Sequence, residues 1–350
     1  MASNFDDFKL AVEALSGGKN TVILDDVGMP SVMVQIPKYK MSQLISGGSE
    51  NVHPAFMVDG AEKDVMYVGK FHDVVINDRT YSLPMKDPAA WMTFDQGVTY
   101  NRNKGKGWSL MPYALWCAIA LWCRKNGTMP HGNNNYGSDS SYPTEVGIPV
   151  PGSLDNGKTA HVYEGTGPAS WYHDGTRAGI YGMNGNVWDR VAGMRLYNGE
   201  IQVIPYSNCF LSDASMAEGS SLWKAIDVSG NLVAPGSAKT LKWGNSNTLT
   251  AGSVTATDSS FGGSFTDMAL DSSITTVPEI AKALLLYPDE PKGDYGGDSH
   301  WWKTSGERIP YCGGFWGNTS AAGVFYVYAL IVRAGSSGGD VGLRSAYCKL

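Results

Sequence analysis

The stretch that decides the fold is YCGGFWGNTSAAGVFYVYALIVRAGSSGGDVGLRSAY, residues 311–347. Gly-rich turns flank a run of apolar and aromatic residues, and the stretch closes on the strand-like VGLRSAY. From Tyr311 to Asp340 it contains no Lys, Glu, Gln or Met. These four types make up about one residue in eight of the chain, so about four would be expected here. A sheet core with Gly-rich loops explains the missing charges but not the missing Met.

Composition places the chain among globular, loop-rich proteins. Its 350 residues include 43 Gly, 18 Tyr and 11 Trp, with 17% charged residues, and this length can bury a full core. The net charge of −6 argues against nucleic-acid binding by bulk electrostatics. No apolar run reaches membrane-spanning length, and the acidic start MASNFDDF is unlike a signal peptide. We therefore expect no membrane insertion and no secretory export.

The clearest predicted helix is SLMPYALWCAIALWCRKNG, residues 109–127. Pro112 suits its first turn, Gly127 suits the position after its end, and its apolar residues on all sides predict burial. Residues 127–185 are rich in Gly, Asn, Pro and Ser, and predict long packed loops. Further predicted elements are a helix over 4–16 capped by Asn4, strands at TVILDD (21–26), PSVMVQI (30–36), EIQVIP (200–205) and SVTATD (253–258), a meander or hairpin over 53–83, and a helical piece, VPEIAKALLLYP (277–288).

The sequence offers no convincing catalytic or metal motif. Its six His residues lack zinc-site spacing, and GSSGG (335–339) matches a nucleophile elbow but is followed by a strand-like segment, which favours a surface loop. The oxygen-rich YHDGT (172–176) and DYGGDSH (294–300) lack EF-hand spacing. The sequence therefore gives no support for a structural calcium ion, although it does not exclude one. We expect no cofactor and no metal. The cysteines, odd in number and without CxxC, predict reduced, mostly buried thiols: Cys117, Cys123, Cys209, Cys312 and Cys348.

The segment GIYGMNGNVWDR, residues 179–190, is more informative. A Gly/Asn-rich turn delivers Trp188, followed at once by Asp189 and Arg190. The pattern favours a tight turn that seats the Trp in the core and leaves the charge pair at the rim.

Three motifs in this order resemble the C-type-lectin-like fold, in the version shared by formylglycine-generating enzymes and the variable proteins of diversity-generating retroelements. GWSLMPYALWCAIALWCRKNG resembles the family's helix, GMNGNVWDR its GNVWEW turn, and GERIPYCGGFW followed by VGLRSAY its RGGSW…GFR ending. The order holds from about residue 50 to the end, while residues 1–49 and much of 200–295 have no match. The resemblance implies an α+β, C-type-lectin-like fold of the formylglycine-generating-enzyme type, with long loops and insertions.

The same resemblance suggests a domain organisation. Residues 50–350 would form the ligand-binding domain, with an insertion at about 200–295 and a variable segment at about 311–340. We find no internal repeat and no linker that separates two domains. Residues 1–49, with a helix and short strands, either attach the protein to a particle or pack on their own domain.

The enzyme branch of the family fails at its essential position. Those enzymes oxidise a cysteine through a close Cys pair between the GGSW and GFR ends. No Cys lies between Trp316 and Leu343 here, and the chemistry requires a thiolate. We therefore expect no enzymatic activity, with a formylglycine-generating-type oxidase as the remote alternative.

The retroelement branch accounts for the missing residue types. Diversification randomises adenines, typically in AAY codons, and the resulting NNY codons never encode Trp, Met, Lys, Glu or Gln. Trp316 would then be scaffold, as would Trp188 and Arg344, and with them Gly323, Val324, Phe325 and Gly342. The inferred frame leaves eleven display positions: Phe315, Gly317, Asn318, Ala321, Tyr328, Leu330, Ile331, Gly335, Gly338, Gly339 and Asp340.

The resemblance implies a hypervariable ligand-binding or receptor-binding protein, of the kind found at phage tail tips. Its partner would be a protein or glycan on a bacterial cell surface, and its location the virion after assembly in the host cytoplasm, or alternatively the bacterial surface. Homo-oligomers and contacts with other virion proteins stay open. The alternative function is a non-variable adhesin of the same fold.

Overall fold

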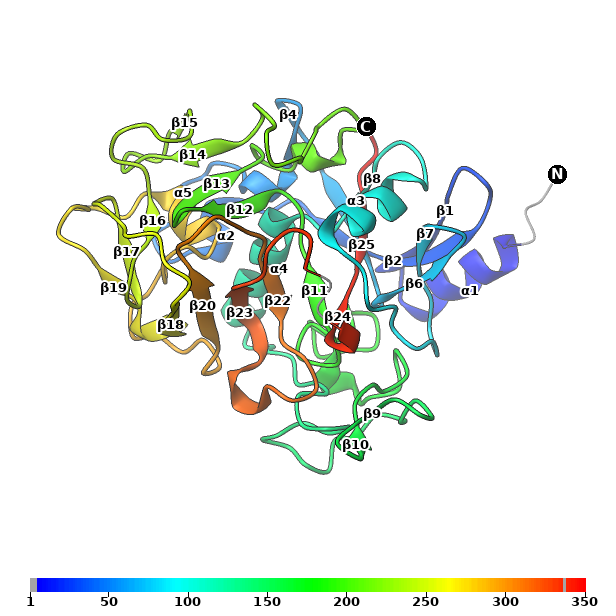
Figure 1. Ribbon diagram of the computed structural model, residues 1–350. Helices are drawn as coiled ribbons and strands as arrows, with labels where there is room; N and C mark the ends of the chain where they lie inside the picture. The colour runs from blue at the N-terminus through cyan, green and yellow to red at the C-terminus, as the bar shows by residue number, and fades with distance from the viewer. Residues whose placement is uncertain (1–4, 336–337) are drawn as a thin grey trace.

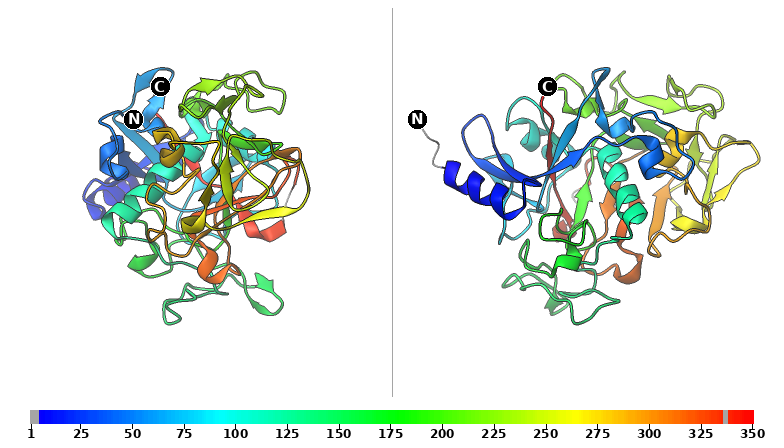
Figure 2. Two further views of the ribbon diagram at one scale, coloured as in Figure 1. Left: turned by 90° about the vertical axis from the view of Figure 1, so that its left-hand side faces the viewer. Right: turned by 180° about the vertical axis from the view of Figure 1, so that it is seen from behind.

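The computed structural model describes residues 5–335 and 338–350, and its centre is the helix α4 (Tyr113–Asn126). The helix begins after Pro112 and ends at Gly127, whose φ of +65° suits a residue without a side chain. Most of its side chains are buried, as the apolar sequence predicted. Figure 2 shows α4 behind the strands that face the viewer in Figure 1, and Trp116 Nε1–H donates to Val324 O at 2.8 Å. The helix therefore backs the sheet that contains β22 and β23.

A five-stranded sheet joins the two ends of the chain. Its order is β1-β2-β5-β25-β8, with the C-terminal β25 inserted between two strands from the first third of the sequence (Figure 1). Ala346 of β25 pairs with Val68 on one side and Ser109 on the other. The strands of the N-terminal segment thus belong to the sheet that the C-terminus completes. The bounds are β1 Asn20–Leu24, β2 Pro30–Pro37, β5 Val65–Gly69, β8 Trp108–Leu110 and β25 Ser345–Tyr347.

A six-stranded sheet brings the GMNGNVWDR, GERIPYCGGFW and VGLRSAY motifs side by side. Its order is β18-β20-β23-β22-β11-β24. The strand that carries Trp188 pairs antiparallel with β22 and parallel with β24, so residues 188–190, 311–313 and 341–342 become neighbours. The bounds are β11 Trp188–Arg190, β18 Ser260–Ser264, β20 Ser299–Lys303, β22 Tyr311–Gly313, β23 Gly323–Ala329 and β24 Val341–Gly342.

An eight-stranded sheet occupies most of the region without family resemblance. It has the order β15-β14-β13-β16-β17-β19, with β12 and β21 paired at its side, and it forms the upper left of Figure 1. The predicted strand at 200–205 is present as β13. The bounds are β12 Met194–Tyr197, β13 Glu200–Val203, β14 Lys224–Ile226, β15 Leu232–Val233, β16 Lys242–Trp243, β17 Thr248–Thr250, β19 Ala269–Leu270 and β21 Glu307–Arg308.

The prediction of a strand at SVTATD (253–258) is wrong, because residues 253–257 have no regular structure. Side chains satisfy their backbone instead of a neighbouring strand. Asn245 donates to Thr255 O and accepts from Thr255 N, both at 2.8 Å. Thr304 Oγ1 accepts from Thr257 N at 3.2 Å. Alternation of β-branched residues predicted the strand, but local side-chain bonding overrides it.

The remaining elements are short. The predicted helix over 4–16 is α1 Asp6–Leu15, which buries no side chain fully; its expected cap, Asn4, lies outside the described residues. The region 53–83 contains two hairpins, as predicted. The bounds are α2 Met41–Leu44, α3 Phe94–Arg102, α5 Glu279–Ala283, β3 Met57–Val58, β4 Ala61–Glu62, β6 Asp73–Ile76, β7 Arg79–Ser82, β9 Leu154–Asp155 and β10 Lys158–Thr159.

Asparagine side chains hold the long loops of residues 127–185 in place. Asn133 Nδ2 donates to Ala160 O at 2.7 Å, and Asn186 Nδ2 donates to Val162 O at 3.1 Å. Asn184 Nδ2 donates to Pro130 O at 2.8 Å. The amide donates and accepts at once, so it can replace the missing strand partners. The Asn-rich composition therefore builds packed loops at the bottom of Figure 1.

A buried ionic network connects these parts. Arg344 Nη2 donates to Asp189 Oδ2 at 3.1 Å, and His72 Nε2 lies 3.2 Å from the same oxygen. His72 Nδ1 lies 3.0 Å from Glu164 Oε1. Burial by itself would lower the pKa of His72, but Glu164 and Asp189 outweigh it and raise the pKa to about 9. Burial would likewise raise the pKa of Asp189, but Arg344 and His72 hold it below its ordinary value.

The network corrects one sequence expectation, since Asp189 and Arg190 do not lie at the rim. Both are buried, because Asp189 is the partner of Arg344, while Arg190 lies 4.7 Å from the Tyr311 ring centroid and donates to Gly335 O at 2.8 Å. Trp188 is also buried, with 3% of its surface exposed.

All five cysteines are free and buried. Across residues 5–335 and 338–350, no helix combines the length and apolarity needed to cross a membrane. Within the same ranges, no three His, Cys, Asp or Glu side chains are grouped so that they could hold a metal ion. In the oxygen-rich turn YHDGT, the Asp174 carboxylate accepts a hydrogen bond from Thr176 N and forms an ion pair with Lys19.

We predict that Arg344→Met lowers the free energy of unfolding by about 3–5 kcal/mol, because it removes the buried guanidinium that bonds Asp189 and leaves His72 to balance both Asp189 and Glu164. Urea denaturation at neutral pH measures this. The double variant Asp189→Asn/Arg344→Met should recover part of the loss. Lys106→Met, at an exposed lysine, is the control. A loss of under about 1 kcal/mol for Arg344→Met would contradict a stabilising role for the pair.

Candidate ligand-binding surface

Aromatic side chains gather around Trp188 on the outer face of the six-stranded sheet. Trp188, Tyr311, Ala322, Tyr326 and Val341 form the buried part of this group, which we call the Trp188 cluster. The Trp188 ring centroid lies 5.2 Å from that of Tyr328 and 6.2 Å from that of Phe315, both roughly stacked. Partly exposed residues surround the cluster: Trp301, Phe315, Ala321, Tyr328 and Ile331.

Alternation along β23 produces this arrangement. Phe325, Val327 and Ala329 point into the main core beside α4, whereas Tyr326 and Tyr328 point to the Trp188 cluster. One strand therefore supplies both the interior of the domain and part of its aromatic surface.

The eleven display positions share one property in the structure. Each is half-buried, with part of its surface open to solvent: Phe315, Gly317, Asn318, Ala321, Tyr328, Leu330, Ile331, Gly335, Gly338, Gly339 and Asp340. Four of them, Phe315, Ala321, Tyr328 and Ile331, lie directly against the Trp188 cluster. The GxSxG serines, Ser336 and Ser337, lie outside the described residues.

The interleaved scaffold positions are buried: Trp316, Gly323, Val324, Phe325, Gly342 and Arg344. Packing explains the two glycines. A Cβ on Gly342 would lie 2.6 Å from Val187 Cγ2, and a Cβ on Gly323 would collide with the carboxylate of Asp298. Trp316 Nε1–H donates to Asp155 Oδ2 at 3.2 Å, which ties it to the loops of residues 127–185.

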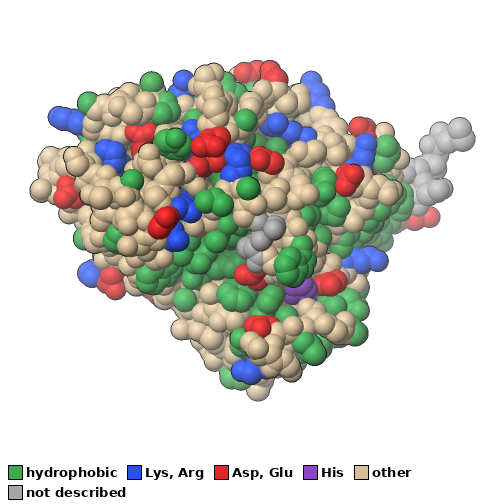
Figure 3. Space-filling model, viewed as in Figure 1, with side chains coloured by type: hydrophobic (Ala, Val, Ile, Leu, Met, Phe, Trp, Pro, Cys, Tyr) green, Lys and Arg blue, Asp and Glu red, His purple; other side chains and the backbone are tan. Residues whose placement is uncertain are grey.

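Figure 3 shows the surface that results. Hydrophobic side chains gather in a band across the middle of this face, over β22 and β23, whereas charged side chains are more frequent above it. The band faces the same way as the labelled strands of the six-stranded sheet in Figure 1. A group of exposed apolar side chains of this kind is typical of an interaction site.

Trp91 is a surface residue that sequence analysis missed. It is 71% exposed, and its φ of +64° is unusual for a bulky residue. Its ring lies beside Gly338 and Gly339, because Cβ atoms added to them would come within 3.6 Å of it. Trp91 N donates to Gly338 O at 3.3 Å. A lone Trp in the loop sequence PAAWM gives no signal of this position.

His161 holds the end of the variable segment against the rest of the domain. Its Nδ1 lies 2.6 Å from Asp87 Oδ1, and its Nε2 lies 2.8 Å from Gly339 O. The ring packs edge to face with Trp316 at 5.1 Å. Residues far apart in sequence thus fix the backbone on which display positions sit.

Asp298 supports β23 from the inside. Its Oδ2 accepts a hydrogen bond from Phe325 N at 2.7 Å, and the side chain is buried. Burial raises the pKa of Asp298 to about 8, although the bond from Phe325 opposes this. The acid therefore favours its neutral form beneath the strand.

Comparisons with known proteins give one weak structural likeness. No family model matches the sequence, and no curated protein matches it. Among solved structures, the chain is similar to Treponema denticola variable protein 1, with 12% sequence identity and a TM-score of 0.30. The match covers 94% of this chain and 98% of that chain. A likeness at this TM-score carries no argument about function.

We predict that Asp298→Asn makes the protein less sensitive to alkaline pH. The pKa of this carboxyl is raised in the fold, so its contribution to stability is complete below about pH 3.8 and is lost as the pH rises through about 8. Asn cannot ionise and should keep its contribution. Urea unfolding from pH 4 to 9 should show the variant gaining at least about 1 kcal/mol relative to wild type.

The control for this change is Asp78→Asn, at an exposed aspartate, which should follow the wild-type pH dependence. Parallel curves for wild type and Asp298→Asn would show that Asp298 is ionised in the fold throughout this range.

Proposed function

We propose that the protein is a ligand-binding protein whose residues 311–340 are diversified by a retroelement. Its binding surface would be the Trp188 cluster together with the display positions around it. The observation that carries this proposal is the pattern of burial along the segment: the eleven display positions are partly exposed, whereas the scaffold positions Trp316, Gly323, Val324 and Phe325 are buried. The turn residues Thr319, Ser320, Val332 and Ala334 are exposed although the inferred frame leaves them fixed. Variation could then change the surface without changing the core.

Chemistry of the surface favours recognition of another macromolecule. Aromatic side chains offer large contact areas at a small cost in conformational entropy, and residues anchored at a rigid sheet bind without first being ordered. Trp91 would serve every variant, because it lies outside the diversified segment yet beside Gly338 and Gly339. The surface would thus combine one constant aromatic anchor with a variable set.

We propose the receptor-binding role of a phage tail protein, with a bacterial surface protein or glycan as the partner. In this proposal residues 50–350 form a C-type-lectin-like domain of the formylglycine-generating-enzyme type, assembled in the host cytoplasm and displayed on the virion. Display in many copies would add weak single contacts into firm attachment. A fixed adhesin of the same fold on a bacterial surface is the alternative.

A non-enzymatic role agrees with the state of the thiols. Cys312 lies in the main core, and burial raises the pKa of its thiol well above the ordinary value. Cys348 is also buried, and burial raises the pKa of its thiol to about 11. Both thiols favour the unreactive protonated form at neutral pH.

The first test is the DNA beside the gene. We expect a reverse-transcriptase gene and a near-copy of codons 308–347 that carries adenine-containing codons at the eleven display positions. Sequencing the locus checks this directly. Absence of both would leave the fixed adhesin as the better account, and template differences confined to scaffold codons would contradict the assignment of positions.

The second test separates binding from folding. We expect Phe315→Ala, Tyr328→Ala and Trp91→Ala each to weaken adsorption of the purified protein to host cells by about 2 kcal/mol, as for central aromatic anchors. Their half-buried or exposed rings should cost about 1 kcal/mol or less in stability. Trp188→Ala should instead cost about 3–5 kcal/mol, because the ring is buried.

Tyr206→Ala is the control for these variants, since Tyr206 is a partly exposed aromatic outside the Trp188 cluster. It should leave adsorption unchanged. Unaltered adsorption in all three surface variants, with melting temperatures preserved, would remove this face from the proposed function.

A further inference from the structure

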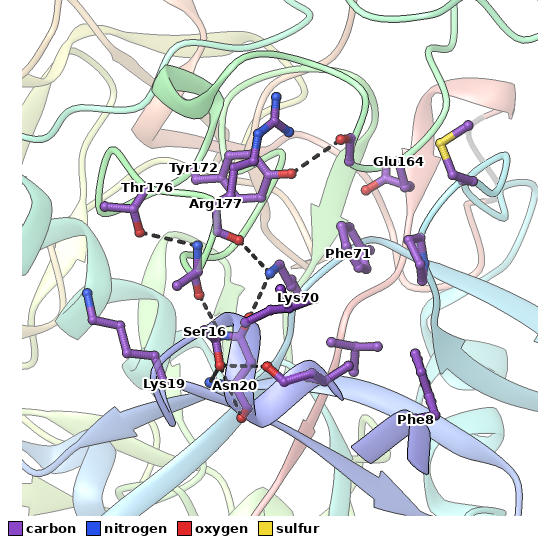
Figure 4. Close-up of a pocket in the computed structure, with 17 residues that line it drawn as sticks. Phe8, Ser16, Lys19, Asn20, Lys70, Phe71, Glu164, Tyr172, Thr176 and Arg177 are labelled. Atoms are coloured by element: carbon purple, nitrogen blue, oxygen red, sulfur yellow. Dashed lines mark hydrogen bonds between the residues drawn. The ribbon is translucent and has the colours of Figure 1, made fainter. Parts of the chain in front are cut away.

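A cavity lies between α1 and the body of the domain, away from the Trp188 cluster. It has a volume of about 700 Å³ and is bordered by α1, β2 and the loops near residues 84, 165 and 177 (Figure 4). It shares no residue with the Trp188 cluster or the display positions. Its size is within the range of sites for small organic molecules.

One wall of the cavity is apolar. Phe8 and Val12 of α1 pack against the cluster that contains Phe71 and Val32, and both helix residues are only partly buried. The apolar face of α1 therefore lines the cavity, and none of its side chains is fully buried. Figure 4 shows Phe8 and Phe71 on the same side of the cavity.

The opposite wall carries a partly buried ammonium group. Lys70 Nζ donates to Asn20 Oδ1 and to Arg177 O, both at 2.6 Å, and lies 5.8 Å from the ring centroids of Phe71 and Tyr172. An ammonium has three hydrogens, so these bonds leave one unused. Within the described ranges, no carboxylate lies at ion-pair distance from Lys70. Burial lowers its pKa to about 8.

The other charged groups leave this wall positive. Glu164 turns its carboxylate inward, where it bonds His72 and Asn186. Lys19 is paired with Asp174 at 3.3 Å. Arg177 is exposed, lies 6.0 Å from the Tyr172 ring centroid, and forms no ion pair with a described carboxylate. Asp174 lies near enough to Lys70 to act against the lowering of its pKa. Lys70 and Arg177 are thus two cations without an ion-pair contact to a described carboxylate.

We propose that this cavity binds an amphipathic anion. The apolar body of the ligand would lie against Phe8, Val12 and Phe71, and its anionic head would bind Lys70 and Arg177. The head group would accept the unused hydrogen of Lys70 and compensate both cations, which favours a carboxylate, sulfonate or phosphate over a neutral group. This inference is independent of the function of the display surface.

The test uses two fluorescent probes with the same apolar body. 1-Anilinonaphthalene-8-sulfonate carries the anion, and N-phenyl-1-naphthylamine lacks it. We expect the folded protein to bind the sulfonate at one site, about tenfold more tightly than the neutral probe, because a charge-assisted hydrogen bond is gained. Lys70→Met and Arg177→Met should each remove most of that preference and leave neutral-probe binding unchanged.

Two further variants complete the design. Phe8→Ala should weaken both probes, and Lys106→Met, at an exposed lysine outside the cavity, should weaken neither. Melting temperatures show whether each variant is folded. If Lys70→Met does not fold, Arg177→Met alone still tests the role of positive charge, because Arg177 is exposed. Equal affinity for the two probes in wild type, or full sulfonate binding by Arg177→Met and folded Lys70→Met, would overturn the proposal.

Discussion

The bond between Arg344 and Asp189 is the constraint on which the rest of the structure depends. It joins the C-terminal segment to the strand that carries Trp188, and through His72 and Glu164 it reaches the loops of residues 127–185. Burial makes each of these charges costly unless all the others are present. The network therefore helps to set the relative positions of three regions that lie far apart in the sequence.

The aromatic surface is a direct result of this arrangement. Within β11, Asp189 points inward to Arg344, while the preceding Trp188 points to the opposite side of the sheet, as strand geometry requires. The inward residue fixes the position of the outward one. Exchange at Phe315 or Tyr328 can then change the surface around Trp188 while the supporting charges stay in place.

Sequence patterns predicted the parts of the structure that depend on local periodicity. The apolar run 109–127 predicted α4, and TVILDD and PSVMVQI predicted β1 and β2. Patterns failed where distant groups decide. SVTATD is irregular because Asn245 and Thr304 bond its backbone. Asp189 is buried because it bonds Arg344, a partner 155 residues away in the sequence. Trp91 and the cavity beside α1 arise from packing between segments and leave no local signal.

The position of β25 has a consequence for how the chain is made. Residues 345–347 fill the gap between β5 and β8, so the five-stranded sheet is incomplete until residue 347 has been synthesised. A stop codon or frameshift within residues 311–340 would remove β25 and Arg344 together, leaving two strand edges open and Asp189 without its bond to a guanidinium. Such a chain could not complete its core, and unpaired edges mark it for aggregation or degradation. A complete fold therefore requires that each copy of the gene is in frame from the diversified segment through residue 347.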